Sequence, residues 1–88
     1  MKLFVYGPLR GATEGKEADI EFDGGTVDDA LSALVDTYPR AKAQLFDDEG
    51  SLRPSVRIQV NGNRVEPDDH CPADAEVTVV PAMRGGLR

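Results

Sequence analysis

The segment from Thr26 to Tyr38 constrains the fold most, because it is the one stretch of this 88-residue chain that predicts a long helix. The Thr26 hydroxyl can accept a hydrogen bond from a free amide of the first turn, and the acidic residues of that turn suit the helix dipole. Apolar residues then recur at spacings of three and four: Val27, Ala30, Leu31, Leu34 and Tyr38. Pro39 ends the segment, since proline disfavours helical angles in the residue before it. Such a helix has one apolar side, which must pack on other elements.

Segments typical of β-strands lie on both sides of this helix. Two precede it and three follow: Lys2–Tyr6, Ala18–Asp23, Ser55–Val60, Asn63–Val65 and Glu76–Val80. Asn61-Gly62 predicts a tight hairpin, because both turn positions need a positive φ. Between the strands we expect a loop with at most a short helical turn at residues 7–16, a second short helical turn at Pro39–Phe46, and an acidic loop at Pro67–Ala73.

This order of elements predicts an α+β fold. Two hairpin-like halves flank one helix, and the helix provides the long crossover that lets the first and last strands pair in parallel at the sheet centre. The predicted arrangement is the ubiquitin-like β-grasp, a mixed sheet with one main helix packed across it. We expect residues 1–81 to form this domain and residues 82–88 to form a flexible tail that carries Gly85-Gly86.

Charge and composition exclude several classes of function. The formal net charge is −6, from 16 acidic and 10 basic residues, which argues against binding to nucleic acid or to an anionic membrane. No apolar run approaches the roughly 20 residues of a membrane helix, and the N-terminal residues lack a signal-peptide pattern. A single cysteine, Cys71, favours a reducing cytoplasm. Ten Asp against three Lys favour a high-salt cytoplasm over the alternative of an ordinary acidic domain.

Most catalytic apparatus is missing from the sequence. His70 and Cys71 are neighbours, and adjacent side chains rarely act as base and nucleophile, so we interpret them as loop residues without a role. Three aspartates (Asp68, Asp69 and Asp74) could attract a cation weakly, although a solvated acidic loop is the better interpretation. The glycines at positions 7, 11 and 15 match no phosphate-binding or dinucleotide pattern. We therefore expect no catalytic residue, no metal and no bound cofactor in this chain.

The most informative feature is the Gly85-Gly86 pair after the last strand. Taken alone, the pair is typical of a flexible terminus. Two glycines can also lie extended in a slot too narrow for other residues. If Gly86 were terminal, its carboxylate could attack the α-phosphate of ATP, and a sulfur nucleophile could then convert the acyl-adenylate to a thioester or thiocarboxylate. Combined with a β-grasp fold, the second interpretation is favoured.

The chain resembles the MoaD/ThiS family of ubiquitin-like sulfur carriers, and within it the small archaeal modifier proteins. The similar stretches run almost end to end: Tyr6–Arg10, Thr26–Pro39, Leu45–Pro54, Val56–Gly62, Glu76–Ala82 and Gly85-Gly86. The resemblance implies activation by an ATP-using adenylating enzyme of the ubiquitin-activating type. It also implies delivery of sulfur to a molybdopterin precursor or tRNA, as in a molybdopterin synthase-like complex with a large subunit, or isopeptide bonds to lysines of target proteins.

Two departures from the family pattern concern the C-terminal part. Family members usually end at Gly-Gly, whereas here Leu87-Arg88 follows, so the Gly86 carboxylate is masked. We therefore expect a precursor that a metalloprotease cuts between Gly86 and Leu87. In addition, Ala73-Asp74-Ala75 replaces the usual Asp-Gly-Asp before the last strand. The alternative function is a β-grasp interaction module whose tail is never activated.

A partner surface is predicted from the first strand. Alternation places Phe4 and Tyr6 on one face and Leu3 and Val5 on the other, so one face packs on the helix and the other stays apolar. Apolar patches on small domains commonly mark partner sites. The predicted docking residues are Phe4, Tyr6, Val80, Met83 and Arg84. The alternative is that loops of the chain itself cover these rings.

Overall fold

The computed structural model describes residues 1–81 of the chain. Its elements, in chain order, are β1 (Lys2–Val5), α1 (Leu9–Thr13), β2 (Glu17–Asp19), β3 (Gly25–Thr26), α2 (Val27–Thr37), the 3₁₀ turn η1 (Pro39–Ala41), α3 (Lys42–Leu45), β4 (Val56–Val60), β5 (Asn63–Val65), β6 (His70–Cys71) and β7 (Glu76–Pro81). The predicted tail at residues 82–88, with its diglycine, lies outside the described residues.

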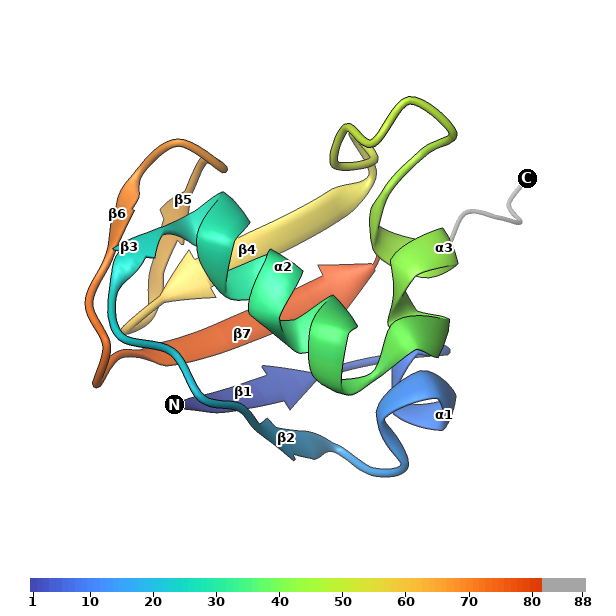
Figure 1. Cartoon of the computed structure of the whole chain (residues 1–88), viewed down its shortest axis with the longest axis horizontal. Coiled ribbons are helices and arrows are strands. Elements are labelled where there is room, and N and C mark those ends of the chain that lie inside the picture. Colours follow the sequence, from blue (N-terminus) through green and yellow to red (C-terminus); the bar gives the residue numbers. More distant parts are fainter. Residues whose placement is uncertain (82–88) are drawn as a thin grey trace.

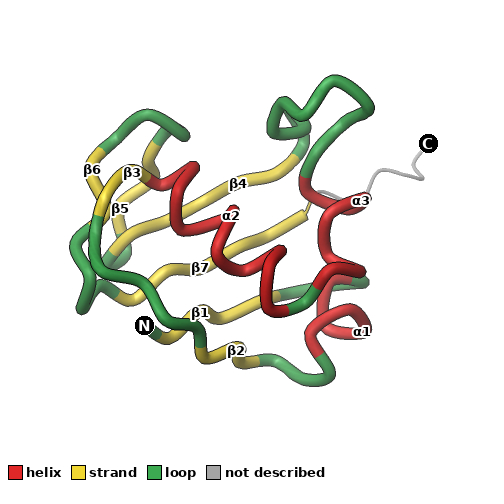
Figure 2. Tube along the Cα trace, in the orientation of Figure 1, coloured by secondary structure: helices red, strands yellow, loops and turns green. Residues whose placement is uncertain are grey.

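A five-stranded mixed sheet forms one layer of the molecule, with strand order β2-β1-β7-β4-β5. The first and last strands lie at its centre and pair in parallel, with Leu3 opposite Val77, while the other neighbours pair antiparallel. Helix α2 crosses one face of this sheet, and α1, η1 and α3 lie together near one end of the helix (Figure 1). The tube in Figure 2 shows the same two layers of helix and strand. The predicted β-grasp topology is confirmed.

Helix α2 begins and ends where the sequence predicts. The Thr26 hydroxyl accepts a hydrogen bond from the Asp29 amide at 3.1 Å, and the Asp29 carboxylate accepts one from the Thr26 amide at 3.1 Å, which forms a capping box. The helix stops at Thr37, two residues before Pro39. None of the helices in the described part of the chain has the length and apolar character needed to span a membrane.

The core lies between α2 and the sheet. Alternate residues of the central strands point toward the helix and are buried, as are four apolar residues of α2. The largest fully buried side chains are Leu3, Val5, Leu9, Val27, Leu31, Leu34, Leu45, Ile58, Cys71, Val77 and Val79. The remaining residues of each strand therefore point to the outer face of the sheet, opposite α2.

The strand predicted at Ala18–Asp23 is wrong in its extent. Strand β2 spans only Glu17–Asp19, and the Ile20 amide still donates to the Met1 carbonyl at 2.9 Å. Asp19 pairs with Lys2, the first residue of β1, so the residues after Ile20 lie beyond the end of this ladder. The hairpin prediction is confirmed, since Asn61 and Gly62 both have positive φ, at 52° and 86°. The short helical turns expected near residues 7–16 and 39–46 are α1 and η1–α3.

The segment predicted as one acidic loop contains a strand that the sequence analysis missed. His70 and Cys71 form β6, which pairs antiparallel with β3 in a separate two-stranded sheet. Cys71 is opposite Gly25, and His70 is opposite Thr26, the N-cap of α2. The pair of short strands thus holds the start of α2 in place.

Candidate functional site

The outer face of the sheet beside the end of β7 is the candidate docking surface. Strand β7 ends at Pro81, which is buried and lies opposite Val56 of β4. In the sequence, Gly85 and Gly86 follow four and five positions after Pro81. The predicted activation residues Gly85 and Gly86, the processing bond Gly86–Leu87, and the docking residues Met83 and Arg84 lie outside the described residues.

Three of the predicted docking residues share this face. Phe4 lies opposite Thr78 of β7, and continuation of the parallel register brings Tyr6 beside Val80. Tyr6 and Val80 are the exposed large apolar residues of the described chain, at 45% and 36% exposure, and Phe4 is half-buried. Loops of the described chain therefore leave Tyr6 and Val80 accessible. We define Phe4, Tyr6 and Val80 as the outer patch.

Arginines flank the outer patch. The Arg10 guanidinium lies 5.2 Å from the centre of the Tyr6 ring, and its Nε donates to the Val5 carbonyl at 3.0 Å. Arg57 of β4 lies directly opposite Val80 in the antiparallel register and is exposed. The patch thus combines apolar area with positive charge on a protein of net charge −6. Such a surface suits a partner that presents apolar and acidic side chains.

The opposite end of the same face is different. Lys2 pairs with Glu17 across β1 and β2, with 3.6 Å between ammonium and carboxylate, and both side chains are about half exposed. The N-terminal ammonium donates to the Ile20 carbonyl at 2.7 Å and lies 3.7 Å from the Asp19 carboxylate. This end is charged and internally paired, so the unpaired apolar area of the face is concentrated near the exit of β7.

The residues that could have carried catalysis do not form a site. His70 is exposed and Cys71 is fully buried, on opposite sides of β6. Burial raises the pKa of the Cys71 thiol, which keeps it protonated and unreactive. The Asp69 carboxylate accepts a hydrogen bond from the Glu66 amide at 2.7 Å, so it stabilises a turn. Residues 1–81 contain no group of three or more side chains arranged to hold a metal ion.

Comparisons with known proteins agree with this geometry. Residues 3–86 match the ThiS family. Small archaeal modifier protein 1 of Haloferax volcanii is 28% identical over 98% of this chain and 100% of its own length. The crystal structure of SAMP1 from Haloferax volcanii has a TM-score of 0.88 at 26% identity, over 98% of each chain. A crystal structure of the Amycolatopsis orientalis BexX/CysO complex has a TM-score of 0.79 over 97% of this chain and 98% of that one, and its 23% identity shows the fold alone.

The relatives of the ThiS family and the small archaeal modifier proteins are small ubiquitin-like carriers or modifiers and not enzymes, so the expectation that the chain is not itself a catalyst is confirmed. The match also extends over both the described domain and the diglycine that follows it. The chain belongs to the ThiS family of ubiquitin-like β-grasp proteins.

Proposed function

We propose that this protein is a sulfur carrier or protein modifier that is activated at the carboxylate of Gly86. The observation that best supports the proposal is the position at which the family match ends. The match stops at residue 86, which is the second glycine of the pair, and leaves Leu87-Arg88 outside it. The part of the chain that matches the family therefore ends at Gly86, whose carboxylate is the group that adenylation requires.

The chemistry proceeds in two steps. A Gly86 carboxylate oxygen attacks the α-phosphate of ATP, pyrophosphate leaves, and an acyl-adenylate forms. A sulfur nucleophile then attacks the acyl carbon and releases AMP, which gives a thioester or, with a sulfide donor, a thiocarboxylate. A lysine amine that attacks the thioester forms an isopeptide bond and releases the thiol. ATP is a substrate of the activating enzyme in this scheme and is not a cofactor of the carrier.

The outer patch supports the proposal by providing a surface for the activating enzyme. It lies at the end of the sheet from which the chain continues toward the diglycine, and it is the part of the described surface with exposed large apolar residues. An enzyme that covers Tyr6 and Val80 would hold the tail near its own adenylation slot. Other partners of the proposal are a molybdopterin synthase-like large subunit, lysines of target proteins, and a metalloprotease that removes Leu87-Arg88.

The test compares three forms of the chain with the cognate activating enzyme: the full chain, the chain that ends at Gly86, and the chain that ends at Gly85. ATP–pyrophosphate exchange should be supported by the form ending at Gly86 alone, because only this form presents the diglycine carboxylate. Equal exchange with the full chain would remove the precursor step, and no exchange with any form would favour the interaction module. The intact mass of the protein from its native cell supplies an independent check, since processing removes Leu87 and Arg88.

A further inference from the structure

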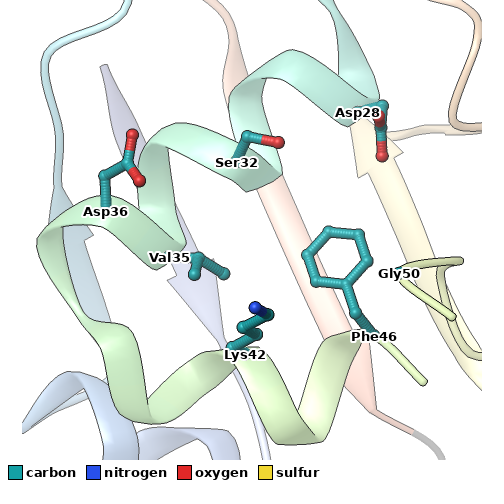
Figure 3. A pocket seen from close by; sticks show the side chains of 7 residues that line it. All are labelled: Asp28, Ser32, Val35, Asp36, Lys42, Phe46 and Gly50. Atoms are coloured by element: carbon teal, nitrogen blue, oxygen red, sulfur yellow. The ribbon is translucent and has the colours of Figure 1, made fainter. Parts of the chain in front are cut away.

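A groove on the helical layer lies apart from the outer patch that is proposed for docking of the activating enzyme. It lies beside α2, between this helix and the segment from Lys42 to Gly50 (Figures 1 and 3). The groove holds about 220 Å³ and is lined by Asp28, Ser32, Val35, Asp36, Lys42, Phe46 and Gly50. A second hollow, which includes Leu52, adjoins it through Asp28 and Gly50.

The floor of the groove is apolar. Val35 and Phe46 are half-buried, pack against the core, and both border the hollow, as Figure 3 shows. This hollow alone is smaller than the roughly 300–1,000 Å³ that is usual for sites of small molecules, whereas the adjoining hollow holds about 540 Å³, so size alone does not select the ligand. The apolar floor at Val35 and Phe46 suits an apolar side chain of a partner protein.

One wall of the groove is acidic. Asp28, Ser32 and Asp36 follow one another at i, i+4 and i+8 along α2, and all three are exposed. Figure 3 shows them in a row above the floor. Within residues 1–81, ion pairs closer than 4 Å involve only Met1 with Asp19 and Lys2 with Glu17, so the carboxylates of Asp28 and Asp36 have no cationic partner there.

The opposite wall is built from short, internally bonded segments. Pro39 ends α2, and η1 and α3 bring Lys42 and Phe46 back beside it. The Asp47 carboxylate then accepts hydrogen bonds from the Glu49 and Ser51 amides at 2.9 and 3.0 Å, and Gly50 has a φ of +83°. The groove is thus formed by the fold itself before any partner binds.

The distance between Asp28 and Asp36 indicates which peptide would fit the groove. Eight residues of α-helix separate Asp28 from Asp36, which is about 12 Å along the axis. An extended peptide covers the same distance in about four residues, and its residues i, i+2 and i+4 point to the same side. A peptide with basic residues at i and i+4 and an apolar residue at i+2 therefore matches the two carboxylates and the floor at once.

We propose that this groove binds an extended segment of a partner protein that carries an apolar side chain between two basic residues. Charge complementarity with Asp28 and Asp36 selects the basic residues, and the hollow between Val35 and Phe46 receives the apolar side chain. Lys42 lies on the other wall and opposes a cationic ligand, so it limits the affinity. This proposal does not depend on activation of Gly86.

The probe is the peptide Arg-Thr-Leu-Thr-Arg, acetylated and amidated, added to the ¹⁵N-labelled full chain in 0.1 M KCl. Amide shifts should move at Ser32, Val35, Asp36, Phe46 and Gly50 and stay constant at the outer patch. The peptides Glu-Thr-Leu-Thr-Glu and Arg-Thr-Ser-Thr-Arg should bind at least about fivefold more weakly, since each lacks one half of the match. Equal binding of the three peptides would overturn the proposal.

Variants that remove charges test which side chains contribute to binding of the arginine peptide. Asp28→Asn with Asp36→Asn should weaken binding of the arginine peptide about fivefold, because two exposed ion pairs are lost. Asp23→Asn with Asp74→Asn removes the same charge from exposed positions outside the groove and should leave the affinity within twofold. Lys42→Ala should tighten binding about twofold. If both double variants weaken binding equally, the peptide senses net charge alone and the groove is not its site.

A final comparison separates two other occupants. The chain's own residues Arg84 to Arg88 also place basic residues four positions apart. If a chain that ends at Pro81 shows shifted groove amides before any peptide is added, the tail occupies the groove and the partner proposal fails. Groove shifts that depend on protein concentration would instead identify a second copy of the chain, which also contradicts it. Identical groove amides in both forms and at all concentrations support a partner.

Discussion

The outer patch gives the sharpest prediction, because its exposed area sets the size of the expected effect. Tyrosine side chains bury about 150–250 Å² when fully covered, so 45% exposure leaves about 90 Å² of Tyr6 for a partner to cover. At about 25 cal/mol per Å², full coverage contributes about 2 kcal/mol. Full burial of a valine contributes about 1.5–3 kcal/mol, so covering the 36% of Val80 that is exposed adds about 0.5–1 kcal/mol. If the partner covers about half of the exposed area of Tyr6 and Val80, the contribution to binding is about 1.4 kcal/mol, which is about tenfold in affinity.

The double variant Tyr6→Ser, Val80→Thr should therefore raise the KM of the activating enzyme for the chain ending at Gly86 by about tenfold. The kcat should change little, because Gly86 itself is unaltered. Threonine keeps the β-branched shape that β7 requires, and Tyr6 lies one residue beyond β1, so the fold should tolerate both changes. Thermal unfolding of the variant establishes that it remains folded.

The matched control is Val35→Thr, which makes the same chemical change at a half-buried valine of α2, on the other layer of the molecule. Its KM should stay within twofold of the unaltered chain. A folded double variant whose KM is also within twofold would refute the reasoning, since the exposed area of the patch would then have no part in docking. Equal increases for the double variant and Val35→Thr would indicate a general effect of the substitutions.

Three further predictions concern stability and reactivity. Thr26→Ala removes the hydroxyl of the capping box and should lower the free energy of unfolding by about 1 kcal/mol in a urea titration, with Ser51→Ala as an exposed control. The thiol of Cys71 is buried, and burial raises its pKa. Iodoacetamide at pH 8.5 should therefore label the native chain at least about a hundredfold more slowly than the chain in urea. Equal labelling rates would mean that β6 opens readily. The melting temperature should rise steeply between 0.01 and 2 M KCl, because the screening length falls from about 30 Å at 0.01 M to about 3 Å at 1 M salt. A melting temperature that stays constant across the series would contradict a high-salt origin. An osmotically matched sucrose series is the control for exclusion of water.

The sequence predicted the elements whose signals are local. The capped, periodic segment after Thr26 predicts α2, and Asn61-Gly62 predicts the β4–β5 hairpin because the turn requires positive φ at both residues. The central position of β1 and β7 followed from the helix between them, which permits a parallel pair. Phe4, Tyr6 and Val80 followed from period-two alternation once the helix had been assigned to the other face.

The features that the sequence did not predict depend on pairing between distant segments. Two-residue strands such as β3 and β6 have no period, so the burial of Cys71 opposite Gly25 has no local signal. The early end of β2 at Asp19 depends on where its neighbour β1 begins, which alternation in residues 18–23 cannot reveal. The groove beside α2 likewise requires that α3 turns back along the helix, and only the angle at Pro39 and η1 determines this return.

The two surfaces lie on opposite layers, and this placement leads to a last prediction. The outer patch is on the side of the sheet that faces away from α2, whereas the groove lies in the helical layer beside α2, so the sheet and the core beneath α2 separate them. A partner bound at one surface therefore leaves the other open. The arginine peptide at saturating concentration should leave the KM for activation within twofold, and Tyr6→Ser should leave the affinity for the peptide within twofold. Competition between the peptide and the activating enzyme would show that the enzyme reaches around to α2, and the two surfaces would then be parts of one site.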